Sequence, residues 1–354
     1  MDKRCFSEKI VEWYHENKRG LPWRDTKDPY YIWLSEIILQ QTRVNQGLPY
    51  YLRFIEKYPN VHLLAAAAED EVLRLWQGLG YYSRARNLHK CAKTVVELHS
   101  GVFPKDYKEL LSLPGVGEYT AAAIASFAFR EPVAVVDGNV FRVLSRVFGI
   151  DTPINSPQGK NEFRQLANEL IDHKAPDLHN QALMEFGATC CTPVAPDCAH
   201  CVLQDRCFAF AKSLQGVLPV KTKSKPSKNR YFYYLVFQQG DSLLMKKRTG
   251  KDIWLGLYDF PLLEYRKPVT GKLLTQDLEK AGYKLSSANT ITMSDTYKHV
   301  LTHQNIFCKF VLLKPRGKTK LGKPETQFYT FSQISALPKP ILINRFLIDF
   351  SFHA

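Results

Sequence analysis

Apolar and polar residues follow two different patterns along the 354-residue chain, and the change falls near residue 230. Up to residue 216, apolar residues return every three or four positions, which is the spacing of one face of an α-helix. Beyond residue 230, short runs rich in Tyr, Phe, Val and Leu indicate strands. The chain is therefore predicted to be multidomain, with an all-α domain at 1–216, a linker at 217–230 and an α+β domain at 231–354.

The expected elements can be placed within each domain. In the first domain, helices are predicted at 6–14, 30–45, 61–75, 83–98, 138–148, 158–172 and 178–188. In the second domain, strands are predicted at 231–237, 242–247, 306–313 and 327–331, and helices at 274–281 and 341–350. The linker is rich in Pro, Lys and Ser without apolar periodicity, so it is expected to be extended and able to follow phosphates.

A further pair of helices is predicted around the residues Leu-Pro-Gly-Val-Gly at 113–117. The proline and the two glycines favour a tight turn, and the alanine-rich residues 119–125 indicate a new helix directly after it. We therefore expect a helix-hairpin-helix at about 106–129. The backbone N–H groups of Gly115 and Gly117 would lie at a helix N-terminus, where a phosphate oxygen can be bound without any base being read.

Two carboxylates stand in apolar surroundings. Glu36 lies between Leu34 and Ile37, and burial there would raise its pKa and keep it partly protonated near neutral pH. Such a group can serve as a general acid, although a partly exposed helix residue is the simpler interpretation of Glu36 taken alone. Asp137 follows the apolar residues 132–136, where a carboxylate is costly to bury unless it is used or paired.

Four of the eight cysteines are crowded into one short loop at 191–207, as Cys191, Cys198, Cys201 and Cys207. Thiolates this close together indicate a metal site rather than disulfides. Zinc and a four-iron cluster both take four thiolates, and the residues themselves do not choose between them. Cys190 is expected to be a structural thiol, and the remaining cysteines are isolated along the chain.

Charge is distributed unevenly between the two domains. Residues 1–216 hold 25 Lys and Arg against 25 Asp and Glu, whereas residues 217–354 hold 23 against 9, so the second part carries the whole net charge of +14. A polyanionic partner would explain this excess, and a solvated basic face is the alternative. No apolar run approaches the roughly 18 residues of a membrane span, and no signal-peptide core is present. We expect a soluble monomer without membrane contact that is cytoplasmic, and associated with the nucleoid if the source is bacterial.

Together, the hairpin, Asp137 and the cysteine spacing resemble the endonuclease III superfamily of base-excision DNA glycosylases. In that superfamily the loop holds a [4Fe–4S] cluster, which the resemblance implies here in place of zinc. Within the superfamily, four segments resemble the MutY-type adenine DNA glycosylases, and the match covers nearly all of residues 6–210. These segments are 21–24 (LPWR), 35–42 (SEIILQQT), 77–84 (QGLGYYSR) and 136–140 (VDGNV).

The residue type at position 119 distinguishes the two nearest kinds of relative, and here it is Tyr119. Bifunctional endonuclease III enzymes carry a lysine at this place, which attacks the sugar and forms a Schiff base. A phenol cannot form that imine. The resemblance therefore implies an enzyme that breaks the glycosidic bond and does not routinely cut the strand.

The resemblance also assigns roles around a flipped adenine. Because adenine leaves poorly as an anion, Glu36 is expected to protonate its N7, and an ionised Asp137 is expected to stabilise the oxocarbenium-like sugar. These roles predict opposed pKa shifts for the two carboxylates. Tyr119 and Asn139 would complete the catalytic pocket. The residues expected to contact the adenine or the duplex are Arg24 and Gln181 at the base, Gln41 and Tyr81 as wedges, and Leu39, Gln40 and Thr42 along the same edge.

The second domain resembles the Nudix-like C-terminal domain of the same family at residues 254–261 (WLGLYDFP). The acidic helix that binds magnesium in active Nudix hydrolases is missing, so hydrolysis is not expected. In the family a Phe-Ser-His tip contacts 8-oxoguanine, and the matching residues here are Leu301, Thr302 and His303. Thr302 keeps the hydroxyl that could read the oxidised edge.

The sequence therefore predicts a monofunctional adenine DNA glycosylase. Its substrate would be double-stranded DNA with adenine opposite 8-oxoguanine or, less well, guanine. Two alternatives stay open: a bifunctional endonuclease III-like lyase, disfavoured by Tyr119, and a catalytically silent lesion-binding protein, disfavoured by Glu36 occurring together with Asp137.

Truncation of the chain after Gly216 tests the role of the basic second part. Because that part carries the whole charge excess, log affinity for duplex DNA should fall less steeply with log salt concentration. The preference for adenine opposite 8-oxoguanine over adenine opposite guanine should also fall, as measured by single-turnover excision. An unchanged preference would contradict lesion reading by residues 217–354.

Overall fold

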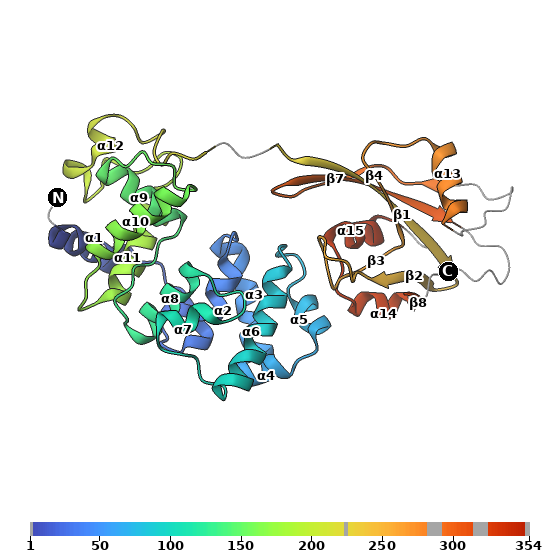
Figure 1. Ribbon diagram of the computed structural model, residues 1–354, viewed down its shortest axis with the longest axis horizontal. Helices are drawn as coiled ribbons and strands as arrows, with labels where there is room; N and C mark the ends of the chain where they lie inside the picture. Colours follow the sequence, from blue (N-terminus) through green and yellow to red (C-terminus); the bar gives the residue numbers. More distant parts are fainter. Residues whose placement is uncertain (1–2, 223–225, 282–291, 314–324, 351–354) are drawn as a thin grey trace. The chain divides into compact units, whose positions relative to one another are not determined.

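The computed structural model describes residues 3–222, 226–281, 292–313 and 325–350 (Figure 1). Two compact units divide the chain: one comprises residues 1–66 and 87–223, and the other comprises residues 67–86 and 224–354. Residues 223–225 of the expected linker lie outside the described residues. A short stretch of the helical sequence thus groups with the C-terminal unit, which the apolar pattern did not predict.

The first unit is all-α, as predicted (Figure 1). Its core helix is α11 (Pro176–Thr189), which packs against α1 (Lys3–Asn17), α8 (Glu118–Phe129) and α9 (Gly138–Phe148). The other helices are α2 (Pro29–Leu39), α3 (Val44–Lys57), α4 (Val61–Ala66), α6 (Ser83–His99), α7 (Tyr107–Ser112), α10 (Pro157–Leu170) and α12 (Phe208–Ala211), with short 3-10 turns at Pro22–Arg24 and Gln204–Arg206. The first residues of α6 belong to the second unit.

Apolar side chains at helical spacing form the core of the first unit. Phe6 and Ile10 of α1, Val143 of α9, Phe163 of α10 and Phe186 of α11 are all buried in one cluster. Removing such side chains from water is the main favourable term in folding, so this cluster fixes the helices that carry the polar residues of the site.

Two expected helices are each divided in the structure. The helix predicted at 30–45 ends at Leu39, because Gln41 adopts a left-handed conformation with φ of 55°, and α3 then begins at Val44. The helix predicted at 61–75 is split into α4 and α5 (Glu69–Leu75). The first turn of α5 contains three acidic residues, which favour a new helix N-terminus.

The helix-hairpin-helix consists of α7, a turn and α8. Asp106 caps α7 by accepting hydrogen bonds from the N–H groups of Lys108 and Glu109. Gly115 has a φ of 74°, and a Cβ atom there would lie 2.5 Å from Cβ of Asn87. The turn therefore requires glycine at this position for both conformation and space.

The described part of the second unit contains a mixed sheet of eight strands. The long strand β1 (Lys228–Gln239) pairs in parallel with β7 (Gln304–Leu313) and antiparallel with β2 (Ser242–Lys247) and β4 (Leu262–Tyr265). The other strands are β3 (Tyr258–Asp259), β5 (Thr292–Met293), β6 (Tyr297–Val300) and β8 (Thr326–Thr330). The sequence pattern predicted β1, β2, β7 and β8, whereas β3 to β6 were too short to be recognised.

Helices cover both faces of this sheet. Leu235 of β1 packs in one apolar cluster with Leu274 of α13 (Gly271–Lys280). On the other face, the ring of Phe310 stacks on that of Phe346 in α15 (Ile341–Asp349) with centroids 3.8 Å apart. Because β1 is buried on both sides, it reads as a continuous apolar run rather than as an alternation. A further short helix, α14 (Phe331–Ala336), was not predicted.

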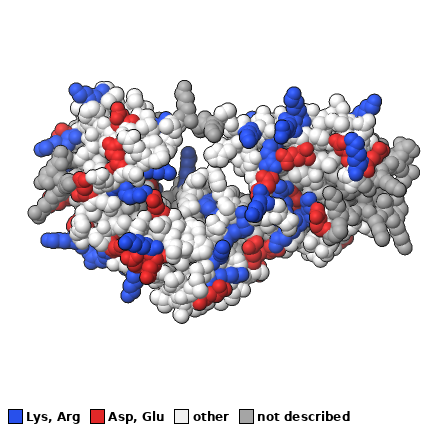
Figure 2. All heavy atoms as spheres, in the orientation of Figure 1, with Lys and Arg blue, Asp and Glu red and all other residues white. Residues whose placement is uncertain are grey.

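Charged side chains are mixed on the face that Figure 2 shows, where Lys and Arg lie beside Asp and Glu. Ion pairs link several charged side chains of the second unit. Arg230 pairs with Asp252 and Glu264, and Arg248 pairs with Asp252 and the fully buried Asp259. Among the described helices, none is long and apolar enough to span a membrane.

Candidate active site

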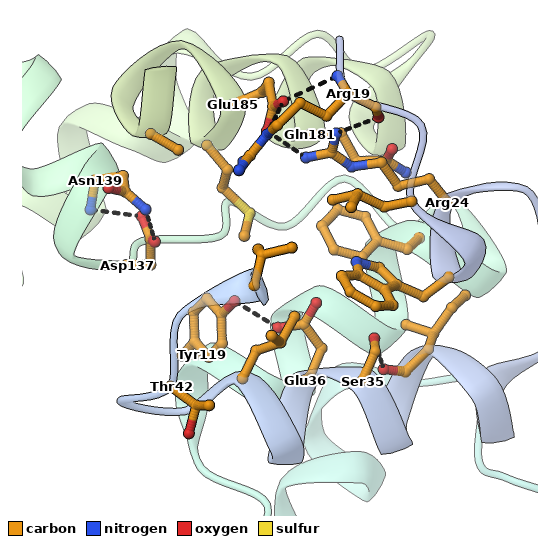
Figure 3. Close-up of a pocket in the computed structure, with 18 residues that line it drawn as sticks. Arg19, Arg24, Ser35, Glu36, Thr42, Tyr119, Asp137, Asn139, Gln181 and Glu185 are labelled. Carbon is orange, nitrogen blue, oxygen red and sulfur yellow. Dashed lines mark hydrogen bonds and ion pairs between the residues drawn. The ribbon is translucent and has the colours of Figure 1, made fainter. Parts of the chain in front are cut away.

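One pocket of about 180 Å³ lies in the first unit, between α2, α8, α9 and α11 (Figure 3). The residues predicted from sequence that line it are Arg24, Glu36, Leu39, Thr42, Tyr119, Asp137, Asn139 and Gln181. The fold thus brings together side chains that are spread over more than 150 residues of sequence.

Glu36 lies at one wall of the pocket and is only 5% exposed, so the interpretation as a partly exposed helix residue is wrong. The hydroxyl of Tyr119 donates a hydrogen bond to Oε2 of Glu36 at 2.5 Å (Figure 3). Burial raises the pKa of Glu36 to about 7, although the hydrogen bond from Tyr119 opposes the shift, and the nearby charge of Asp137 adds to it. Glu36 can therefore exchange a proton near neutral pH.

Asp137 is the N-cap of α9, a role that the sequence analysis did not recognise. Its Oδ1 accepts hydrogen bonds from the N–H groups of Asn139 and Val140 at 2.9 and 2.8 Å. Its Oδ2 accepts a hydrogen bond from Nδ2 of Asn139 at 2.7 Å (Figure 3). These donors, which favour the charged form, hold the carboxylate beside the pocket.

The expected opposed pKa shifts of the two carboxylates are wrong. Burial raises the pKa of Asp137 as well as that of Glu36, because both carboxylates are removed from water. The N–H groups that cap α9 and the charge of Arg142 act against burial at Asp137. The two groups therefore differ in the number of donors around them rather than in the direction of the shift.

Glu185 on α11 forms a second polar wall, which the sequence analysis missed. Its two carboxylate oxygens accept hydrogen bonds from Nε of Arg19 and Nη2 of Arg24, each at 2.6 Å (Figure 3). Burial opposes ionisation, but these arginines outweigh it and lower the pKa of Glu185 to about 2. The spacing of four residues between Gln181 and Glu185 on one helix could have indicated this wall.

Gln181 is fixed at the same end of the pocket. Its Oε1 accepts a hydrogen bond from the hydroxyl of Tyr14 at 3.0 Å. The guanidinium of Arg24 lies 5.7 Å from the centre of the Tyr14 ring. Arg24, Gln181 and Glu185 thus offer positioned donors and acceptors opposite Glu36.

Arg142 connects this pocket with the cysteine loop, a role that no local sequence pattern indicated. Its Nη2 donates to Oδ1 of Asn139 at 2.8 Å, and its Nε donates to the carbonyl oxygen of Cys191 at 2.7 Å. Because Asn139 in turn holds Asp137, the position of this carboxylate depends on the loop at 191–207.

The four predicted cysteine ligands, together with Cys190, line one cavity of the first unit. No three described His, Cys, Asp or Glu side chains are grouped so that they could hold a single metal ion. A tetrahedral zinc site needs four sulfur atoms around one point at about 2.3 Å, whereas a four-iron cluster binds each thiolate through a different iron. Four cysteine side chains around one cavity are the donor set that a four-iron cluster takes.

Arg146 fixes this loop from inside the core, where it is 2% exposed. Its Nη1 donates to Sγ of Cys191 at 3.4 Å and to the carbonyl oxygen of Thr192 at 2.8 Å. Its Nη2 donates to the carbonyl oxygen of Gln215 at 2.6 Å. Burial raises the pKa of the Cys191 thiol, and the charge of Arg146 acts against this shift and favours the thiolate.

The remaining predicted residues of the first unit lie outside the pocket. Gln41 is exposed in a left-handed conformation, and Nε2 of the neighbouring Gln40 donates to the hydroxyl of Thr120 at 3.2 Å. Gly115 and Gly117 lie in the hairpin, before the first turn of α8, whose N–H groups have no partner within the helix.

A second pocket, of about 300 Å³, lies within the second unit. It is lined by Tyr81 together with Leu301, Thr302 and His303, which follow β6. The hydroxyl groups of Tyr81 and Thr302 share a hydrogen bond. Trp254 lines the same pocket, so aromatic and hydroxyl groups face one space.

Comparison with known proteins agrees with this geometry. The family model described as HhH-GPD superfamily base excision DNA repair protein matches residues 34–172, and that of the NUDIX domain matches residues 232–349. The solved structure of a thermostable thymine-DNA glycosylase is 31% identical, with a TM-score of 0.55, over 59% of this chain and 97% of that chain. A non-covalent endonuclease III–DNA complex shares the fold, with 23% identity and a TM-score of 0.52 over 61% of this chain and 99% of that chain.

The fold and the pocket thus define a helix-hairpin-helix DNA glycosylase of base-excision repair. Two curated relatives narrow the class. The adenine DNA glycosylase of Buchnera aphidicola subsp. Acyrthosiphon pisum is 31% identical over 86% of each chain, and that of Homo sapiens is 34% identical over 85% of this chain and 66% of the human one. The chain belongs to the adenine DNA glycosylase family, which confirms the resemblance and the two-domain fold class. It is an N-glycosylase that acts on DNA.

The buried position of Glu36 predicts a stability that depends on pH. Burial raises the pKa of Glu36 from 4.5 to about 7. The contribution of this group to the free energy of unfolding is therefore fully present below about pH 4.5, and it is lost as the pH rises through 7. Glu36→Gln carries no such loss and should be more stable than the unchanged protein by on the order of 3 kcal/mol at pH 8, with little difference at pH 5.

Chemical denaturation at several pH values measures this difference. Glu56→Gln makes the same change at an exposed position of α3 and serves as the control. A stability gain that stays constant from pH 5 to pH 8 would contradict the raised pKa.

Proposed function

We propose that the chain removes adenine opposite 8-oxoguanine, and less well opposite guanine, from double-stranded DNA. The observation that carries this proposal is the buried Glu36 beside Tyr119, facing a pocket that also holds Asp137. A carboxyl group with a pKa near 7 is matched to proton transfer at neutral pH. The enzyme would act as a monomer.

The adenine must leave the base stack to reach this pocket. With the base inside, Glu36 would donate its proton to N7, while Arg24, Gln181 and Glu185 offer donors and acceptors to the other edge. Protonation lets the electron pair of the glycosidic bond move onto N9, so adenine departs as a neutral base. This step is typically worth about 10²–10⁴ in rate.

Departure of the base leaves positive charge on the deoxyribose. Asp137 would remain ionised because three hydrogen bonds from Asn139 and Val140 support its carboxylate, and its negative charge would stabilise that cation. Water then adds to the sugar carbon and loses a proton, which leaves an abasic site. Tyr119 holds Glu36 by its hydroxyl and has no amine with which to attack the sugar.

The second unit would read the base opposite the adenine. Tyr81, Leu301, Thr302 and His303 line one pocket, and the Thr302 hydroxyl can donate or accept a hydrogen bond at the oxidised edge. Gln41 and Tyr81 would fill the space that the flipped base leaves. The hairpin N–H groups at Gly115 and Gly117 would bind a phosphate of the backbone.

Cys191, Cys198, Cys201 and Cys207 would hold a [4Fe–4S] cluster. Such clusters can accept or release one electron, but no step of the excision needs this. The cluster would fix the loop that contacts Arg142 and hence the position of Asp137. Its contribution to the reaction would be structural.

Glu36→Gln tests the proposed acid. The variant should bind the adenine·8-oxoguanine duplex but excise adenine at least 100-fold more slowly in a single-turnover assay, because it has no proton to give. In the unchanged enzyme the rate should fall as the pH rises above about 7, where Glu36 loses its proton. Glu56→Gln should keep the full rate. Retained excision by Glu36→Gln would remove Glu36 from this role.

Borohydride treatment during the same assay separates the alternative functions. A hydrolase should give abasic DNA without a trapped protein–DNA adduct, since Tyr119 forms no imine. Efficient trapping with strand cleavage would favour the endonuclease III-like lyase. Tight binding without release of adenine would favour a silent lesion-binding protein.

Protein purified without oxygen should be brown and absorb near about 410 nm, the usual colour of four-iron clusters. Replacing Cys198 by Ser should bleach this absorbance, because one of the four thiolates is lost, whereas Cys91→Ser should not, because Cys91 does not line the cavity. A colourless protein with one zinc per chain would contradict the cluster.

A further inference from the structure

The turn between α5 and α6 presents Tyr81 in an unusual backbone conformation. Gly78, Gly80 and Tyr81 all have positive φ values, of 106°, 71° and 47°. Glycine adopts this region readily, but a tyrosine is disfavoured there because its Cβ crowds the backbone. The Tyr81 side chain is nevertheless 46% exposed, so its own burial does not explain the conformation.

Arg84 lies directly behind this turn, in the first turn of α6. Its Nη2 donates hydrogen bonds to the carbonyl oxygens of Leu79 and Gly80, both at 3.3 Å. The indole N–H of Trp76 donates to the same Gly80 oxygen at 3.0 Å. Two donors thus converge on the carbonyl group that directly precedes Tyr81.

The guanidinium of Arg84 also lies over two aromatic rings. Its Cζ is 5.0 Å from the ring centre of Trp76 and 5.6 Å from that of Tyr81. A planar guanidinium can donate in its plane and stack with its faces at the same time, which a lysine ammonium cannot do. One side chain therefore restrains both the backbone of the turn and the Tyr81 ring.

Arg84 is poorly placed to bind DNA phosphate itself. It is only 9% exposed, and burial lowers its pKa to about 10, so it stays charged at neutral pH. A cation used for phosphate binding would be kept in water and aimed outward. The charge of Arg84 is instead directed at carbonyl groups within its own turn.

We propose that Arg84 is a positioning residue that holds Tyr81 in the conformation that enters the duplex at the mispair. This inference rests on the proposed function, in which Tyr81 fills the space beside the lesion. Arg84 acts through Tyr81 and does not touch the substrate. Its effect should therefore vanish when the Tyr81 ring is absent.

A double-mutant cycle tests this coupling. Arg84→Met keeps an unbranched apolar stem but removes the guanidinium group. It should slow single-turnover excision at adenine·8-oxoguanine at least 10-fold. Tyr81→Leu should cause a similar loss, and the double variant should lose no more than about threefold beyond the larger single effect. Single losses that multiply in the double variant would overturn the proposal.

A fluorescent base reports the wedge directly. With 2-aminopurine beside the 8-oxoguanine, binding of the unchanged protein should raise the emission as neighbouring bases unstack. Arg84→Met should give less than half of that rise while its cluster absorbance and melting temperature stay near those of the unchanged protein. An unaltered rise would overturn the proposal.

Two further variants keep the test decisive. Arg53→Met removes an exposed arginine whose guanidinium lies 4.3 Å from the centre of the half-buried Tyr50 ring, and this variant should excise adenine at the full rate. Arg84→Lys keeps the charge without the planar guanidinium donors, so it should give an intermediate rate. This variant replaces Arg84→Met if Arg84→Met does not fold. A full rate in Arg84→Lys would also overturn the proposal. If the unchanged protein itself fails to excise adenine, the proposed function fails, and not the role of Arg84 alone.

Discussion

The proposed chemistry of this protein depends on the burial of one carboxyl group. Glu36 is almost excluded from water, and a charge in that position is costly, so the group keeps a proton at a pH where a surface glutamate would have lost it. The rest of the pocket is compatible with this constraint. Tyr119 donates a hydrogen bond to Glu36, and Arg19 and Arg24 form ion pairs with the negatively charged Glu185.

The same fold gives each acidic side chain a different number of donors. Glu185 has two arginines and is strongly acidic, Asp137 has the capping N–H groups of α9, and Glu36 accepts a hydrogen bond from Tyr119. Burial alone would have raised the pKa of all three carboxyl groups. Local donors therefore decide which group keeps its proton and which keeps its charge.

Two turns, one in each unit, hold a residue in an unfavourable backbone conformation. Gln41 and Tyr81, the two residues expected to enter the duplex, both have positive φ values. Each belongs to a turn that is tied to its surroundings, through Gln40 to Thr120 in one case and through Arg84 in the other. Such conformations persist only where neighbouring contacts hold them, and they are often found at functional sites.

Apolar periodicity, glycine turns and ligand spacing are local patterns, so the residues alone predicted the fold classes, the hairpin, the cysteine loop and the pair Glu36 and Asp137. The burial of Glu36 and the raised pKa values of both carboxyl groups became visible in the folded chain. The fold alone also placed Glu185 and Arg142 in the site. Burial and hydrogen-bond partners come from residues far apart in the chain, so no local pattern can specify them.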